Sequence, residues 1–333
     1  MKAIAYSIKP FEKEFLATAN QKKHDITLIS NPLSSETAIY AEGKDAVVVF
    51  TNDDVSAPIV NHLADLGIKY IATRSAGTDH IDKDAATKRN IQVANVAVYS
   101  PQAIAEHTIA LALSLNRHTI QANANSHHFD FRLNGLIGFN FYGKTVGLIG
   151  LGNIGQAVAA IFNGFGCRVI GYDVTPPENL VNIQLVSFEE VLGQSDIISL
   201  HIPLNAANKY IINAATIAKM KKGIMLLNTS RGGLINTKDA LKAIETGHIG
   251  YLGLDVYENE KGLFFEDHQQ DEHKDKTLEE LMTFTNVLIT PHQAFLTAEA
   301  LQQIADKTIQ NLDFWEKMNL KEKNQKFSNQ NQA

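Results

Sequence analysis

Three glycines follow an apolar run in the middle of the chain, in the segment GLIGLGNIGQAVAAIFNGFG. Gly150, Gly152 and Gly155 form a GxGxxG pattern between a predicted strand and a predicted helix. In this pattern the first glycine permits a tight turn, the second lets a pyrophosphate approach the backbone, and the third lets helix and strand pack closely. The N–H groups and the positive dipole end of the helix then face the phosphates. The segment therefore predicts a dinucleotide-binding site.

An acidic residue ends the next predicted strand, CRVIGYD. Asp173 lies 18 residues beyond Gly155. A carboxylate at this place can accept hydrogen bonds from the ribose 2′-hydroxyl of the cofactor and repels a 2′-phosphate. The pattern therefore favours NAD(H) over NADP(H).

Charged and titratable residues follow three later predicted strands. Arg231 lies in NTSRGGLINT, Asp255 and Glu260 lie in LDVYENEKG, and His292 lies in NVLITPHQAF. Taken singly, Arg231 could be a solvated loop charge, Glu260 part of an acidic turn, and His292 a loop histidine with a satisfied ring. Ligands of open parallel sheets bind at the carboxyl ends of the strands. We therefore expect these side chains to gather beside the cofactor.

These residue types suit the reduction of a 2-oxo acid. Arginine binds a carboxylate through two parallel hydrogen bonds, which lysine cannot do, so Arg231 is the predicted carboxylate ligand. Negative charge grows on the carbonyl oxygen as a hydride arrives, and His292 can supply the proton. A carboxylate on the other ring nitrogen, predicted to be Glu260, would fix the tautomer and favour the protonated ring. Asp255 is expected to orient the nicotinamide or to set the field around this pair.

The elements that must carry these residues alternate between strands and helices. This alternation predicts an α/β fold with two doubly wound parallel sheets, each covered by helices on both faces. β-branched apolar runs predict five strands in the first sheet, at 3–7, 25–30, 45–50, 68–73 and 91–96, and six in the second, at 144–150, 167–173, 195–201, 223–228, 250–255 and 286–290.

A long helix begins after Ser100, its predicted N-cap, with Pro101 at the first helical position. It marks the expected start of a second domain. The last predicted helix, 297–318, must pack on a partner, and a return to the first sheet would make that domain discontinuous. We therefore expect one domain from 1–99 and 297–333, and another from 100–296. The polar tail 319–333 is expected to be frayed or disordered.

Composition limits the possible partners. The 333 residues carry a net charge of −6, with 44% apolar and 20% charged residues, and no stretch concentrates lysine and arginine. This argues against nucleic acid and against a membrane surface as partners. No window approaches the ~18 apolar residues of a membrane span, and the N-terminus is typical of a first strand rather than a signal peptide.

The single cysteine, Cys167, excludes an internal disulfide and favours a reducing, cytoplasmic location. It is interpreted as a packing residue. We predict no metal, because His127 and His128 are adjacent and lack a third ligand at a suitable spacing. His107 and Arg117, in the long helix, are assigned to dimer packing or surface exposure.

The segments GLGNIG, NTSRGGLINT, DVYENE and TPHQAFLT, in this order, closely resemble the D-isomer-specific 2-hydroxyacid dehydrogenases. Within that family the chain looks most like the NAD-dependent D-lactate dehydrogenases. RSAGTDHID, VYSPQAIAEHT and HQAFLTAEA extend the similarity over nearly the whole chain. The resemblance implies a Rossmann NAD-binding domain, a flavodoxin-like substrate domain, a substrate cleft between them, and a homodimer formed through the helix after Ser100 and the arm NANSHHFDFRLNG.

The resemblance also implies a role for individual residues. Arg231 would bind the substrate carboxylate, His292 would be the acid and base, Glu260 its partner, and Asp255 a cofactor-side residue. The backbone N–H groups of Ala76 and Gly77 and the hydroxyl of Tyr99 would meet the substrate, and Phe295 would wall the methyl pocket. Further cofactor contacts would come from Asn153, Ile154, Ile202, Pro203, Asn208, Thr229, Ser230 and Arg231.

The predicted function is the reversible reduction of pyruvate to D-lactate by NADH. One alternative is a dehydrogenase for a larger 2-oxo acid such as 2-oxoisocaproate, because pocket volume cannot be read from sequence. Another is a binding protein that senses NAD(H) without turning over a substrate. The presence of Arg231, Glu260 and His292 together argues against the binding protein.

Overall fold

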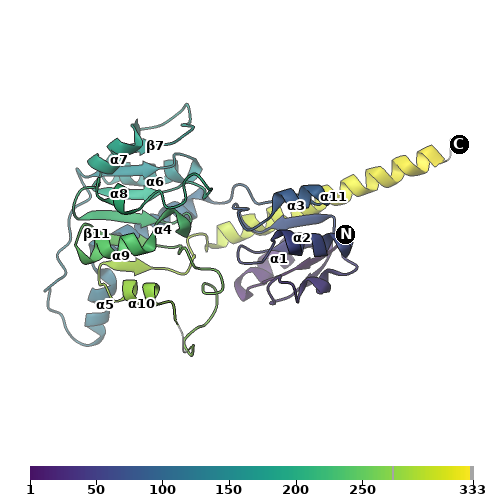
Figure 1. The fold of residues 1–333 in the computed structure, drawn as a ribbon, viewed down its shortest axis with the longest axis horizontal. Coiled ribbons are helices and arrows are strands. Elements are labelled where there is room, and N and C mark those ends of the chain that lie inside the picture. The colour runs from purple at the N-terminus through teal and green to yellow at the C-terminus, as the bar shows by residue number, and fades with distance from the viewer. Residues whose placement is uncertain (272–273, 331–333) are drawn as a thin grey trace. The chain divides into compact units, whose positions relative to one another are not determined.

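The computed structural model describes residues 1–271 and 274–330, which divide into two compact units. One unit comprises Met1–Ser100 and Leu296–Ala333, and the other comprises Pro101–Phe295. The first unit thus combines the two ends of the chain, purple to blue and yellow in Figure 1, while the second is built from the continuous middle segment, teal to green.

Within its described residues the first unit contains a five-stranded parallel sheet, of the doubly wound kind that the sequence predicts. Helices α1 (Lys13–Asn20), α2 (Ala57–Asp65) and α3 (Lys83–Lys88) and the short turns η1 (Pro10–Glu12) and η2 (Ala38–Ala41) accompany it. The strand order is β2 (Asp25–Leu28), β1 (Lys2–Ala5), β3 (Ala46–Val49), β4 (Tyr70–Thr73) and β5 (Gln92–Ala94).

The last helix, α11, runs from Ala298 to Gln330 and packs against α1 and β4. Trp315 is buried there and stacks on Tyr70, with ring centroids 4.7 Å apart. The expectation of a frayed or disordered tail from 319 onward was wrong as far as Gln330. Residues 319–330 contain three lysines and two glutamines and no glycine or proline, so no residue there breaks the helix that tertiary packing begins. Residues 331–333 of the tail lie outside the described residues.

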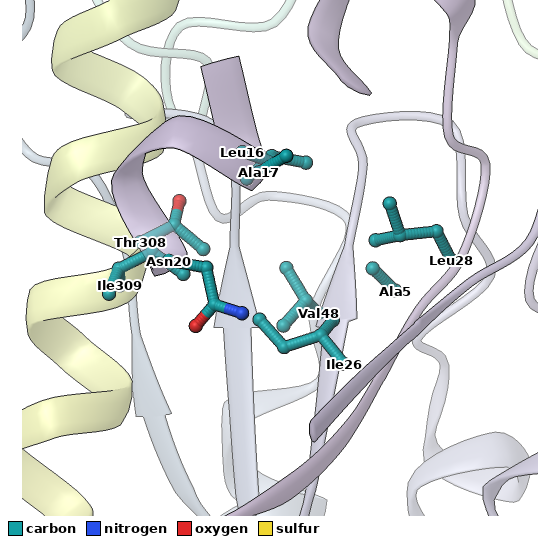
Figure 2. A pocket seen from close by; sticks show the side chains of 9 residues that line it. All are labelled: Ala5, Leu16, Ala17, Asn20, Ile26, Leu28, Val48, Thr308 and Ile309. Atoms are coloured by element: carbon teal, nitrogen blue, oxygen red, sulfur yellow. The ribbon is translucent and has the colours of Figure 1, made fainter. Parts of the chain in front are cut away.

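A cavity of about 170 Å³ lies between α1, α11 and the sheet of the first unit (Figure 2). Its two polar wall residues already have partners: Thr308 donates to the Ile304 carbonyl at 2.7 Å, and the Asn20 side chain bonds the His24 backbone. The other seven lining residues are apolar, so the wall offers mainly apolar contacts. Its lining residues are Ala5, Leu16, Ala17, Asn20, Ile26, Leu28, Val48, Thr308 and Ile309.

In the part of the second unit that the structure describes, a parallel sheet has seven strands rather than the six expected. The additional strand, β8 (Gln184–Leu185), has only two residues, and both are exposed. Two residues are too few to produce a periodic apolar pattern in the sequence. The order is β12 (Val287–Ile289), β11 (Ile249–Leu254), β10 (Ile224–Asn228), β9 (Ile197–Leu200), β6 (Thr145–Ile149), β7 (Arg168–Tyr172) and β8 (Gln184–Leu185).

Strand order reverses between β6 and β9, which is the topological switch point where ligands of such sheets bind. Helix α4 begins at Pro101, as the sequence predicts, and packs against α6 and β11. The helices of this unit are α4 (Pro101–Asn116), α5 (Thr119–His127), α6 (Asn153–Gly164), α7 (Phe188–Gln194), α8 (Ala214–Ile217), α9 (Thr237–Glu245) and α10 (Lys276–Met282), with the short turn η3 (Gly232–Leu234).

Cys167 is buried in the core of the second unit, where its thiol donates to the Phe141 carbonyl at 3.2 Å. Burial raises the pKa of this thiol to about 11. A thiol that stays protonated is a poor nucleophile, so the interpretation of Cys167 as a packing residue is confirmed.

Among the described residues, no helix combines the length and apolar character needed to cross a membrane.

Candidate active site

The glycine turn joins β6 to α6 at the switch point. Gly150 has φ +102°, and a Cβ there would lie 2.4 Å from the carbonyl oxygen of His201. A Cβ on Gly155 would lie 2.1 Å from the carbonyl oxygen of Gly150. These two positions therefore require glycine for backbone conformation and for close packing of helix on strand.

Gly152 differs from the other two glycines. A Cβ on this residue would meet no atom of the described chain within 4 Å. Gly152 is the N-cap of α6, no described side chain caps the helix there, and both Gly152 and Asn153 are exposed. The first N–H groups of an uncapped helix are suited to bind an anion, so the turn fits the pyrophosphate of a dinucleotide. Ile154 and the buried Gly155 follow on the first turn of the same helix.

Asp173 follows β7 directly and faces the glycine turn. Its Oδ2 accepts the backbone N–H of Leu151 at 2.7 Å, and its Oδ1 accepts that of Thr175 at 2.9 Å. These bonds fix the carboxylate beside the glycine turn. Its recognition of the ribose stays a prediction.

The loop after β9 carries Ile202, Pro203 and Asn208. The Asn208 side chain donates to the Pro203 carbonyl at 2.7 Å and accepts from the Asn205 backbone at 2.8 Å, so it closes its own loop. Ser230, in the turn after β10, donates to the Ile202 carbonyl at 2.5 Å. The two turns are thereby tied together, and their contact with a cofactor stays a prediction.

Arg231 lies in the turn after β10, which buried Asn228 organises. The Asn228 amide donates to the Arg231 carbonyl at 2.9 Å and accepts from the Ser230 backbone at 3.0 Å. A Cβ on Gly232 would lie only 2.0 Å from the carbonyl carbon of Tyr257. The absence of a side chain at Gly232 therefore lets the Arg231 turn press against the loop after β11, which carries Glu260.

Thr229, in the same turn, is buried, and its hydroxyl lies 2.9 Å from that of Thr108 on α4. This hydrogen bond attaches the turn to the helix that packs behind it. The Thr229 hydroxyl thus has a protein partner, and its predicted cofactor contact remains untested.

His292 and Glu260 form a pair across two neighbouring loops. Nδ1 of His292 lies 2.9 Å from Oε1 of Glu260, and the side chains are 16% and 19% exposed. The second carboxylate oxygen of Glu260 accepts the backbone N–H of Tyr257 at 3.1 Å, which orients the carboxylate. With Nδ1 occupied, Nε2 is the ring nitrogen that can serve a reacting group.

The turn that carries His292 rests on Asp255. This fully buried carboxylate accepts the Thr290 hydroxyl at 2.6 Å and the backbone N–H groups of Gln293 and Ala294 at 2.9 and 2.8 Å. His292 itself has φ +54°, a left-handed conformation that is costly for a residue with a side chain. Asp255 therefore stabilises the strained turn, a role that the sequence did not indicate.

Two aromatic rings flank the imidazole of His292. The Phe295 ring stands nearly perpendicular to it at 6.5 Å, and the Phe265 ring lies at 5.8 Å with a tilt of 38°. Phe295 was expected beside the substrate methyl group, and it does lie beside His292. Phe265 comes from the long loop after β11, where no sequence pattern singled it out.

His107 was assigned to dimer packing or surface exposure; surface exposure was wrong, and dimer packing stays a prediction. Its side chain on α4 is only 16% exposed, and its Nε2 lies 3.0 Å from the Thr290 hydroxyl and 3.3 Å from Oδ1 of Asp255. The helical pattern of α4 could not reveal this contact, because it depends on how β11 and β12 pack against the helix.

His201, at the end of β9, is a further residue that the sequence analysis did not single out. Its Nε2 lies 2.9 Å from the Ser199 hydroxyl, and its carbonyl lies against the glycine turn. Removal of the ring from water lowers the pKa of His201 to about 3. This histidine is therefore neutral at physiological pH.

Ala76, Gly77 and Tyr99 belong to the first unit. Ala76 and Gly77 follow β4, and their carbonyls accept the Asn95 amide and the Ser75 hydroxyl, both at 2.7 Å. Tyr99 lies shortly before the end of the first continuous segment of that unit. Their contact with a substrate stays a prediction.

Across residues 1–271 and 274–330, no group of three His, Cys, Asp or Glu side chains is placed to hold a metal ion.

The middle of the chain matches a known family. Residues 109–294 match the model of the D-isomer specific 2-hydroxyacid dehydrogenase, NAD binding domain. A D-lactate dehydrogenase from Curvularia clavata is 44% identical over 323 residues, which cover 95% of this chain and 93% of that protein.

Solved structures agree with this match. The pyruvate reductase of Chlamydomonas reinhardtii is 43% identical, with a TM-score of 0.87 over 93% of this chain and 95% of that one. The apo-structure of D-lactate dehydrogenase from Escherichia coli is 39% identical, with a TM-score of 0.85 over 95% of this chain and 97% of that one. This chain therefore belongs to the D-isomer specific 2-hydroxyacid dehydrogenases, a family of NAD-dependent oxidoreductases, and its second unit contains the NAD-binding domain.

Proposed function

We propose that this enzyme reduces pyruvate to D-lactate with NADH, reversibly. The observation that carries the proposal is the His292–Glu260 pair, which lies in the NAD-binding unit beside the turn that bears Arg231. The names of similar proteins, D-lactate dehydrogenase and pyruvate reductase, support the substrate. The D configuration of the product follows from family membership.

Arg231 binds the substrate carboxylate. Its Nη1 donates to the Ser230 carbonyl at 2.8 Å, so the guanidinium is held at the turn rather than extended into solvent. An arginine guanidinium can form a two-pronged contact with a carboxylate and can polarise the neighbouring carbonyl. This contact would select 2-oxo acids over simple ketones and aldehydes.

His292 supplies and removes the proton. When bound, NADH supplies the hydride that reduces the carbonyl carbon of the substrate. As negative charge develops on the carbonyl oxygen, Nε2 of His292 donates its proton, while Glu260 on Nδ1 holds the orientation of the ring. In the oxidation of D-lactate the neutral ring accepts the hydroxyl proton.

The glycine turn and its neighbours hold the cofactor. We assign the pyrophosphate to the N–H groups at Gly152 and Asn153 and the adenosine ribose to Asp173. Asp255 would supply a carboxylate near the nicotinamide and help to orient that ring. The other assigned contacts are Gly150, Ile154, Gly155, Ile202, Pro203, Asn208, Thr229, Ser230 and Arg231.

The size of the substrate side chain distinguishes pyruvate from larger 2-oxo acids. We assign Phe295 to the wall of the methyl pocket, and Ala76, Gly77 and Tyr99 to the carboxylate side. The test is kcat/KM for pyruvate, 2-oxoisocaproate and hydroxypyruvate. The proposal predicts the highest value for pyruvate, and a preference for 2-oxoisocaproate would contradict it. Tight NADH binding without turnover of any of the three would indicate a sensing protein instead.

We also propose that the enzyme is a homodimer. Six large apolar side chains between residues 120 and 142 are 62–87% exposed, and an apolar surface of this kind is typical of a buried interface. A second copy of the chain would cover it. Sedimentation equilibrium should give a dimer for the wild type and a monomer for Phe131→Asp, and a monomeric wild type would contradict the proposal. The side chains are Ile120, Phe129, Phe131, Leu133, Ile137 and Tyr142.

A cytoplasmic location fits the single, buried cysteine, since no disulfide can stabilise the chain. Fractionation of cells that express the protein tests this location, and recovery of the enzyme outside the cytoplasmic fraction would contradict it.

A further inference from the structure

We propose that His107 on α4 is a positioning residue for the acid–base histidine, acting through Thr290 and Asp255. The proposal rests on the proposed function of His292. It assigns a role to a residue that the proposed chemistry does not use.

The hydrogen-bond directions in this network follow from the groups present. The hydroxyl proton of Thr290 is donated to Asp255, with 2.6 Å between the oxygens. The Thr290 oxygen can therefore only accept from His107, whose Nε2 lies 3.0 Å away. The same Nε2 lies 3.3 Å from Oδ1 of Asp255. His107 thus carries its proton on Nε2 and donates it to the Thr290 oxygen.

This donation holds the hydroxyl that bonds a buried carboxylate. Oδ1 of Asp255 accepts from the Thr290 hydroxyl and the Gln293 backbone, and Oδ2 accepts from the Ala294 backbone. Nε2 of His107 donates to the Thr290 oxygen and lies 3.3 Å from Oδ1, so it fixes Thr290 beside the carboxylate. His107 therefore helps to keep Asp255 in its present position.

The position of Asp255 matters because it determines the turn that carries His292. The left-handed conformation of His292, φ +54°, persists only if the surrounding bonds enforce it. The two backbone N–H groups that Asp255 accepts are those immediately after His292, at Gln293 and Ala294. A weaker hold on Asp255 would let the turn relax and would lengthen the 2.9 Å contact between His292 and Glu260.

The place of His107 in helix α4 suits it to hold Thr290 and Asp255 in position. It lies in the middle of α4, whose flanking residues Ile104, Thr108 and Leu111 are buried in the same unit. The ring is thus attached to a rigid helix, whereas its partners lie at the end of β12 and in the loop after β11. The helix provides the fixed point against which the loop is held.

The test compares two substitutions of His107 with a matched histidine elsewhere in the unit. His107→Phe keeps an aromatic ring but removes the donor, and His107→Gln restores an N–H near the place of Nε2. His248→Phe is the control, because its Nε2 also contacts an oxygen, the Met220 carbonyl at 3.1 Å, but at the start of β11 rather than at its carboxyl end.

Two readouts separate positioning from general stability. With the full-length enzyme, kcat for pyruvate reduction should fall about tenfold in His107→Phe, while the Kd for NADH and the Tm change no more than in the control. His107→Gln should recover kcat to within about threefold of wild type. Equal kcat in His107→Phe and wild type, or a loss that Gln does not restore, would overturn the proposal.

Amide hydrogen exchange tests the same idea without turnover. The N–H groups of Gln293 and Ala294 should exchange at least tenfold faster in His107→Phe than in wild type, and at the wild-type rate in His248→Phe. Unchanged exchange in His107→Phe would overturn the positioning role. If wild type fails to reduce pyruvate, the proposed function is wrong, and the exchange rates still decide whether His107 holds the turn.

Discussion

The Nδ1 atom of His292 lies 2.9 Å from Oε1 of Glu260, although the two residues are separated by 32 positions in the sequence. Adjacent parallel strands produce this meeting, because β11 and β12 end at the same edge of the sheet and each continues into the loop that carries one partner. The neighbouring strand β10 ends in the Arg231 turn, and Gly232 lets that turn approach the loop of Glu260. Three neighbouring strands thus supply the three groups of the proposed chemistry.

Replacement of His292 by glutamine should remove the proton donor while it keeps a polar side chain of similar reach. We expect kcat for pyruvate reduction to fall by about a hundredfold or more, with little change in the affinity for NADH. Steady-state kinetics and a fluorescence titration with NADH measure the two quantities. Turnover near the wild-type rate would remove His292 from the acid–base role.

Replacement of Glu260 by glutamine should exchange the carboxylate acceptor at Nδ1 for an amide, which can present either an oxygen or an N–H group to the ring. The amide no longer fixes the tautomer and orientation of His292, so kcat for pyruvate reduction should fall by about tenfold at neutral pH. The measurement is kcat of both proteins under the same conditions. Equal kcat would show that Glu260 does not act on His292.

Replacement of Arg231 by lysine should keep the positive charge and lose the planar fork. One of two charge-assisted hydrogen bonds to the substrate carboxylate is then lost, so KM for pyruvate should rise by about tenfold or more. The rise should exceed any change in the Kd for NADH. An unchanged KM for pyruvate would contradict the role of Arg231 as carboxylate ligand.

Replacement of Gly232 by alanine should separate the Arg231 turn from the loop after β11. The new Cβ would lie 2.0–2.3 Å from backbone atoms of Tyr257 and Glu258, which cannot move independently. We expect a loss of about 3 kcal/mol in the free energy of unfolding, measured by denaturant titration, with a loss of activity. Gly193→Ala is the control, since its Cβ would meet no atom of the described residues within 4 Å. Equal stability of the two variants would show that the approach of the loops is not needed.

His201 should make the enzyme less stable in mild acid. Burial lowers its pKa in the folded chain to about 3, from an ordinary value of 6.5, so the unfolded chain binds the additional proton between these limits. The contribution of the neutral His201 ring to the free energy of unfolding is therefore fully present above pH 6.5, and it decreases as the pH falls below that value. The loss amounts to roughly 1–2 kcal/mol between pH 7 and pH 5.

The test is the free energy of unfolding of wild type and His201→Gln at both pH values. Glutamine does not titrate, so its stability should depend less on pH in this range. A parallel decline of the two proteins would show that His201 is not the group responsible.

Much of the fold could be predicted because its strands are buried on both faces. The run at 45–50, for example, is apolar without interruption, and β3 (Ala46–Val49) is fully buried between helices. The short, exposed β8 lacks this signal, and its two residues pair only because β7 is already in place. The tail beyond residue 318 looked too polar to fold, yet it extends a helix that packing on the first sheet has already nucleated.

The candidate site could be predicted where the chemistry leaves a motif, as at the glycine turn, Arg231 and His292. Each of these residue types is demanded by a reacting group, and each follows a strand that the sequence reveals. Residues that act through other residues leave no such signal. Asp255 was expected to orient the nicotinamide or to set the field around the His292–Glu260 pair. Its support of the turn, and the contact of His107 with Thr290, were not foreseen because they depend on packing between α4, β11 and β12.

Reduction of pyruvate to D-lactate with NADH is the activity that we propose for this enzyme. The most direct measurement is the loss of NADH absorbance when purified enzyme is mixed with pyruvate, followed by chiral analysis of the product. We expect NADH consumption matched by D-lactate, with both rates reduced by about a hundredfold or more in His292→Gln. No NADH consumption with pyruvate, or L-lactate as the product, would contradict it.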